Sequence, residues 1–83
     1  MEDNYAMEGQ RLYNLIRSKG FTIYSFAKRC QYSNARMYKL CKGEYDIASV
    51  KTYNVIIFAR VLGFETIDKF LEVLGIDLLK DIV

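Results

Sequence analysis

Five long polar or cationic side chains occur within nine residues, with no carboxylate among them. They are Asn34, Arg36, Tyr38, Lys39 and Lys42. A lysine can reach guanine O6 or N7, and an asparagine amide can bond adenine bidentately. In a helix, Met37, Leu40 and Cys41 would share the opposite, apolar face. The pattern predicts a helix over about 34–42 whose outer face suits an anion.

Two short helices joined by a tight turn would position this face. Thr22 can cap the first helix and Ser33 the second, because each hydroxyl can accept from a free backbone N–H of the turn that follows. The first helix has apolar residues at i, i+3, i+4 and i+7: Ile23, Phe26, Ala27 and Cys30. Helices of this length and spacing predict a helix-turn-helix, whose second helix can enter the major groove of DNA.

From Gly9 to Gly43 the chain resembles, without a gap, the Cro/C1-type (XRE, phage-repressor-like) helix-turn-helix family. The same or similar residue types stand at Gly9, Leu12, Leu15, Lys19, Gly20, Phe21, Thr22, Phe26, Ala27, Ser33, Met37, Leu40 and Gly43. A looser match continues from Phe58 to Phe64. The resemblance implies an all-α, five- to six-helix lambda-repressor-like bundle. It also implies a sequence-specific DNA-binding transcriptional regulator, repressor-like and of phage or mobile-element type.

The chain departs from the family pattern at several positions. Ile23 stands where the family usually has a Gln that helps to hold the DNA backbone, and Gln31 stands where a Gly is common. That second position often needs a left-handed backbone. Ile16 and Cys41 replace an Arg and a Glu that the family tends to pair. Because both charges are absent together, neither is left buried alone. We therefore expect these two side chains to touch in the core.

Charge is divided unevenly along the chain. Residues 9–43 contain eight basic and no acidic residues, whereas residues 44–83 contain four basic and seven acidic residues. The first half of the chain is therefore strongly positive and is expected to attract a polyanion. We expect base contacts from Asn34, Ala35, Arg36, Tyr38 and Lys39, with Ala35 against a thymine methyl. We expect phosphate contacts from Arg11, Lys19, Thr22, Lys28, Arg29, Ser33 and Lys42.

The remaining pattern predicts one domain over 1–83, with a short N-terminal segment over 1–8. Helix one should span about Glu8 to Lys19 and end at Gly20. After a loop over 44–48, with Asp46 or Ser49 as a cap, helix four should span about Ser49 to Leu62. Its core stripe would be Val55, Phe58, Ala59 and Leu62. The last predicted helix starts at Glu65-Thr66, buries Ile67, Phe70, Leu71 and Leu74, and stops at Gly75.

Several apolar residues on helix four and in the tail lie outside these core stripes. We expect Ile56, Ile57, Val61, Leu78, Leu79, Ile82 and Val83 to form a homodimer interface. The tail over 76–83 would then be a short amphipathic helix or an extended arm. The alternative is that this tail folds back over helix four of its own chain.

Composition excludes several classes of protein. The chain of 83 residues is 52% apolar and contains no Pro and no linker. It shows neither a signal peptide nor the ~20 apolar residues of a membrane span, which indicates a cytoplasmic protein. With no His and two Cys, the sequence predicts no metal site, no cofactor and no enzyme. Reduced thiols are expected at Cys30 and Cys41, with a disulfide as the alternative.

Domains of this shape also serve as protein-binding modules. The alternative function is therefore an antitoxin, anti-CRISPR or regulatory partner that uses the same basic face on another protein or a ribonucleoprotein.

Overall fold

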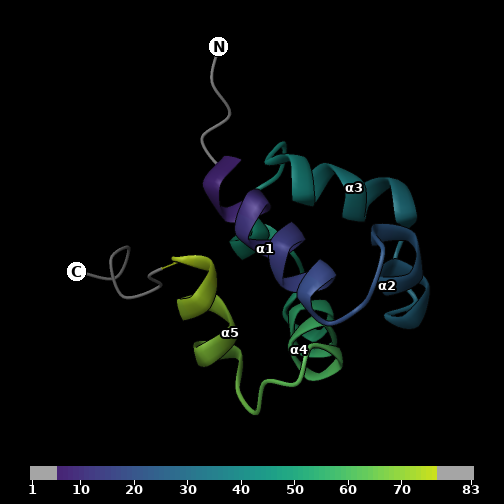
Figure 1. Cartoon of the computed structure of the whole chain (residues 1–83). Coiled ribbons are helices and arrows are strands. Elements are labelled where there is room, and N and C mark those ends of the chain that lie inside the picture. The colour runs from purple at the N-terminus through teal and green to yellow at the C-terminus, as the bar shows by residue number, and fades with distance from the viewer. Residues whose placement is uncertain (1–5, 77–83) are drawn as a thin grey trace.

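The computed structural model describes residues 6–76, and every regular element in that range is helical (Figure 1). The elements are α1 (Ala6–Ser18), α2 (Ile23–Arg29), α3 (Asn34–Lys42), the short 3₁₀ helix η1 (Ile47–Ser49), α4 (Thr52–Val61) and α5 (Ile67–Leu74). Figure 1 shows α1 crossing the centre of the molecule, with α2 and α3 to one side and α5 to the other. The predicted all-α class is confirmed for these residues.

Side-chain caps begin α2 and α3 as predicted. Thr22 Oγ1 accepts from the backbone N–H of Ser25 at 3.0 Å, and Ser25 Oγ accepts from that of Thr22 at 2.9 Å. Ser33 Oγ accepts from the N–H of Arg36 at 3.3 Å. Each hydroxyl satisfies a donor that the first helical turn leaves free. The start of α3 is therefore determined locally by its sequence.

The connection between α2 and α3 contains a non-glycine residue with a left-handed backbone. Gln31 has a φ of 56°, at the position where the sequence departs from the usual Gly. The N–H groups of Gln31 and Tyr32 donate to the carbonyls of Lys28 and Ala27 at 3.1 and 2.9 Å. These bonds satisfy carbonyls at the end of α2 and offset the steric cost of the left-handed conformation.

Two predicted helices have different bounds in the structure. Helix α1 starts at Ala6 rather than Glu8 and ends at Ser18, and α4 starts at Thr52 rather than Ser49. The second difference arises because residues 47–49 form η1. Asp46 accepts from the N–H of Ala48 at 3.0 Å, and Ser49 Oγ donates to the Asp46 carbonyl at 2.7 Å. Asp46 thus caps η1, and Ser49 completes that turn instead of capping α4.

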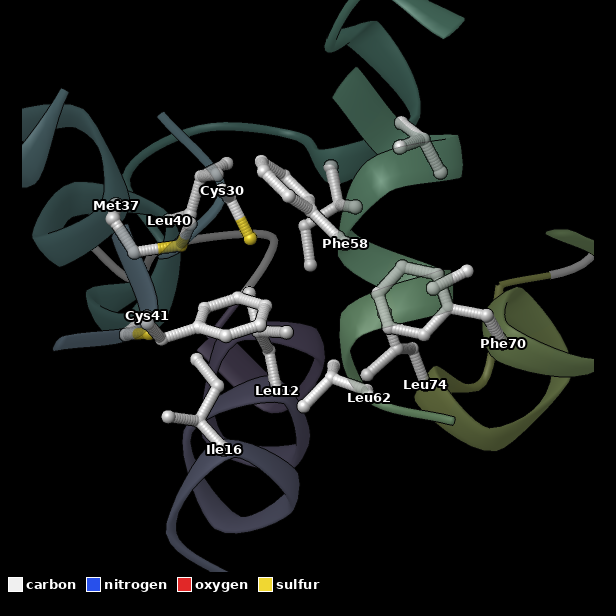
Figure 2. Packing of buried hydrophobic residues seen from close by; sticks show 14 of the residues in the cluster. Leu12, Ile16, Cys30, Met37, Leu40, Cys41, Phe58, Leu62, Phe70 and Leu74 are labelled. Atoms are coloured by element: carbon white, nitrogen blue, oxygen red, sulfur yellow. The ribbon is translucent and has the colours of Figure 1, made fainter. Parts of the chain in front are cut away.

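One apolar cluster joins the helices (Figure 2). It includes the predicted stripes of α4 and α5, except that Ile67 is only partly buried. The ring of Phe58 on α4 lies 5.8 Å from that of Phe26 on α2, and 5.0 Å from that of Tyr32 in an edge-to-face arrangement. Since such aromatic pairs add to the stabilisation from burial, these contacts fix the α2–α3 connection against α4.

Helix α1 approaches the end of α3 too closely for a side chain. A Cβ on the buried Gly9 would lie 2.6 Å from the carbonyl oxygen of Leu40 and 2.7 Å from that of Cys41. It would also lie 2.7 Å from the backbone nitrogen of Gly43. Gly9, which matches the Cro/C1-type pattern, therefore has a packing role, because it lets α1 lie directly against the inner side of α3.

The substituted pair Ile16 and Cys41 lies in the core. Ile16 is fully buried and Cys41 is 8% exposed, and Figure 2 shows both in the part of the cluster between α1 and α3. Their direct contact stays a prediction. Cys30 and Cys41 are free thiols rather than a disulfide. Burial raises the pKa of Cys30 to about 11 and that of Cys41 to about 12, so both thiols are neutral near pH 7.

The predicted dimer surface is only partly within the described residues. Ile57 and Val61 are partly buried against the core of their own chain, and Ile56 is also partly buried. Leu78, Leu79, Ile82 and Val83 lie outside the described residues. Across residues 6–76, no helix combines the length and apolar character that crossing a membrane requires.

Candidate nucleic-acid interface

The outer face of α3 is exposed and free of carboxylates. Asn34, Ala35, Arg36, Tyr38, Lys39 and Lys42 are all exposed, while Met37, Leu40 and Cys41 are buried. The helical period of 3.6 residues separates the two sets, so the apolar residues hold the helix and the polar residues face outwards. The structure therefore brings all five predicted base-reading residues to the surface of one helix.

Two lysines of this face are placed over tyrosine rings. Lys39 Nζ lies 5.7 Å from the ring centre of Tyr45, and Lys42 Nζ lies 5.1 Å from that of Tyr38. Such contacts contribute about 0.5–1 kcal/mol at exposed sites. They direct Lys39 towards the segment that follows α3, and they hold Lys42 beside a residue one turn earlier. Sequence reasoning did not anticipate these pairings.

The predicted phosphate-binding residues divide into different environments. Lys28 and Arg29 are exposed in the last turn of α2, and Lys19 is exposed just after α1. Thr22 and Ser33 both use a lone pair as a helix cap. The Thr22 hydroxyl also donates to Ser25 Oγ at 3.1 Å. Within residues 6–76, the Ser33 hydroxyl is found only as an acceptor, from the backbone N–H of Arg36.

Arg11 has a different partner from the one predicted. Its Nη1 donates to the carbonyl oxygen of Leu74 at 3.1 Å, at the C-terminal end of α5. A Cβ on Gly75 would collide with the same guanidinium nitrogen. A cation is favourable at a helix C-terminus because the last carbonyls carry partial negative charge. We therefore assign Arg11 to the α1–α5 contact, and its phosphate contact stays a prediction.

Two tyrosine-lined grooves flank α3. The α2 groove, of about 330 Å³, is lined by Tyr13, Arg17, Thr22, Ile23, Tyr24, Asn34 and Tyr38. The α4 groove, of about 430 Å³, is lined by Tyr32, Arg36, Tyr45, Ser49, Val50, Lys51, Tyr53 and Asn54. All six tyrosines of residues 6–76 line one groove or the other, and none of the acidic residues in that range lines either groove. Sequence reasoning missed these grooves, because their residues follow no common spacing.

Glu8 and Asp46 form an acidic pair beside Gly9, where α1 meets the end of α3. The pKa of Glu8 is raised, first by burial of its carboxyl group and then by the nearby charge of Asp46. The backbone of Ile47 and the charge of Arg11 act in the opposite direction. Within residues 6–76, Glu8 Oε2 has no hydrogen-bond partner. This carboxyl group is therefore poorly compensated when it is ionised.

The described residues hold no group of three or more His, Cys, Asp or Glu side chains that could bind a metal ion. Comparisons with protein-family models, with curated proteins and with solved structures found no match for this chain.

Proposed function

We propose that this protein binds duplex DNA in a sequence-specific manner through α3, as a repressor-like transcriptional regulator of phage or mobile-element type. The observation that carries the proposal is the exposed, carboxylate-free outer face of α3, held from behind by apolar packing. The resemblance of residues 9–43 to the Cro/C1-type family supports the same function and a lambda-repressor-like arrangement of the helices.

In this proposal, α3 enters the major groove with its N-terminal residues nearest the base edges. Asn34 bonds adenine, Arg36 or Lys39 bonds guanine, and Ala35 contacts a thymine methyl. Lys28, Arg29, Lys42 and Lys19 bind phosphates and set the position of the helix along the duplex. Thr22 and Ser33 add hydroxyl contacts at the starts of the two helices.

Selection of bound sequences from a random duplex pool, followed by affinity measurements at several salt concentrations, tests this function. A preferred sequence that binds more tightly than unrelated duplexes at the same salt would support it. Affinity that falls steeply with salt but equally for every sequence would reduce the function to non-specific binding. Absence of better than micromolar binding at low salt would overturn it.

We further propose that the regulator acts as a homodimer through Ile56, Ile57, Val61 and the apolar tail. Two α3 helices would then address half-sites one helical turn apart, roughly 34 Å, in a near-palindromic operator. Sedimentation measures the oligomeric state directly. A protein that stays monomeric at high concentration would contradict the dimer and favour a tail that covers its own α4.

A protein-binding module is the second candidate, and the α2 groove favours it. This groove has three tyrosines and also Ile23, where the resembled family usually has a DNA-contacting Gln. Tyrosine is enriched at protein interfaces because its rigid ring provides a large contact area with one polar group. If no duplex binds, this candidate replaces the first.

A further inference from the structure

The α4 groove combines cationic, amide and aromatic side chains, and Arg36 alone among them is also proposed to contact DNA. Its lining includes the cations Arg36 and Lys51, the amide of Asn54 and the rings of Tyr32, Tyr45 and Tyr53. Arg36 comes from α3, whereas Lys51, Tyr53 and Asn54 come from the start of α4. The groove therefore extends the positive surface from α3 onto a second helix.

The tyrosines of this groove differ in how firmly they are held. Tyr32 packs edge-to-face on the buried Phe58 with ring centres 5.0 Å apart, so it forms a fixed wall. The ring of Tyr45 already lies beneath Lys39 Nζ. Tyr53 is 60% exposed, and no aromatic or cation–π contact of its ring is found within residues 6–76. Tyr53 is thus the ring that is free to stack on a flat ligand.

We propose that the α4 groove binds a nucleotide, with the base stacked on Tyr53 and the phosphate held by Arg36 and Lys51. The volume of about 430 Å³ falls within the range of about 300–1,000 Å³ that small-ligand sites occupy. Aromatic rings bind bases of any sequence, and guanidinium and ammonium groups bind phosphate. The Asn54 amide can both donate to and accept from a base edge.

The ligand is either a free nucleotide or an unpaired nucleotide within a strand, since both present the same base and phosphate. An acidic peptide would match the charge of the groove but would provide no planar ring for Tyr53. The combination of ring, cation and amide therefore favours the nucleotide. The site does not depend on duplex binding, because a base within a duplex is stacked on its neighbours and does not expose its face.

Nuclear magnetic resonance titration of the ¹⁵N-labelled full chain tests the proposal. The probes are adenosine and thymidine monophosphates, an eight-nucleotide oligothymidylate, ribose 5-phosphate, hexaglutamate and a duplex. The nucleotides should shift the amide signals of Arg36, Lys51, Tyr53 and Asn54, and ribose 5-phosphate should bind more weakly. Binding of the monophosphates would identify a free nucleotide as the ligand, and binding of the oligothymidylate alone would identify an unpaired strand.

Tyr24→Ala is a matched control for Tyr53→Ala, because Tyr24 is 61% exposed and lines the other groove. Tyr53→Ala should weaken nucleotide binding by about 5- to 150-fold, the usual effect of removing one stacked ring. Tyr53→Phe should retain most of the affinity, and Tyr24→Ala should leave it unchanged. Lys51→Gln should weaken binding and lower its salt dependence, and it provides a second test if Tyr53→Ala does not fold.

Three outcomes would overturn the nucleotide site. They are equal losses for Tyr24→Ala and Tyr53→Ala, equal affinities for ribose 5-phosphate and the nucleotides, and shifts of the same residues by hexaglutamate alone. The duplex probe separates this proposal from the DNA-binding function. Failure of the duplex to bind while nucleotides still shift the signals of the α4 groove would reject the DNA-binding function and leave the nucleotide site.

Discussion

The buried and exposed faces of α3 differ in which substitutions they tolerate. The inner face packs so closely on α1 that Gly9 has no room for a methyl group, and it consists of Met37, Leu40 and Cys41. The outer face has exposed side chains that contribute little to the core. Changes on the inner face should therefore alter folding, whereas changes on the outer face should alter binding alone. Stability and the proposed function can be separated on a single helix.

The largest effect is expected from a charge on the inner face. Cys41→Glu would bury an unpaired carboxylate and should destabilise the protein by roughly 3 kcal/mol or more. If Ile16 and Cys41 touch, Ile16→Arg combined with Cys41→Glu should recover part of this loss. Chemical denaturation of the two single variants and the double variant measures the coupling. Additive effects would disprove the predicted contact.

The next largest effect is expected from Gly9→Ala, which tests the close approach of α1 to α3. Gly→Ala inside a helix normally stabilises by about 0.5–1 kcal/mol. Gly9→Ala should instead destabilise by about 1–3 kcal/mol, because its Cβ would overlap backbone atoms that cannot move independently. Thermal melts measure the difference, with Gln10→Ala on the exposed side of α1 as the control. A stabilised Gly9→Ala protein would refute the tight contact.

Outer-face variants should fold normally and change DNA binding. Asn34→Ala should reduce the preference at one base position by about 1–3 kcal/mol, because one bidentate contact is lost. Lys42→Ala should weaken all sequences alike and lower the slope of log affinity against log salt by about one unit. Affinities for single-base operator variants at several salt concentrations distinguish the two effects. If neither variant changes affinity, the outer face binds a protein instead.

The smallest effect concerns the acidic end of the α1–α3 contact. Because the pKa of Glu8 is raised in the folded protein, the folded state binds the proton more readily than the unfolded state. Stability should therefore increase as pH falls towards the ordinary value of 4.5 from above and decrease as pH rises from 4.5. Glu8→Gln should flatten this dependence, with the exposed Glu72→Gln as the control. Denaturation midpoints measured across this pH window provide the test, and unchanged curves would contradict the assignment.

Features that depend on neighbouring residues were predictable from the sequence alone. Thr22, Ser33 and Thr66 cap helices because a hydroxyl reaches the N–H three residues later. The apolar spacing predicted the inner face of α3, because helical geometry alone decides which residues share a face. Even the left-handed backbone at Gln31 could be placed, because the Cro/C1-type family that the sequence resembles commonly has Gly at this position.

Only the tertiary structure decided the features that join distant segments. Arg11 bonds a carbonyl 63 residues away, so its spacing from other cations could not reveal its partner. The two grooves collect tyrosines from α1, α2, α3, α4 and the connections between them. No period in the sequence relates these residues, because their proximity follows from how the helices pack. The chain therefore specified its helices and its charged face locally, while packing determined which side chains surround that face.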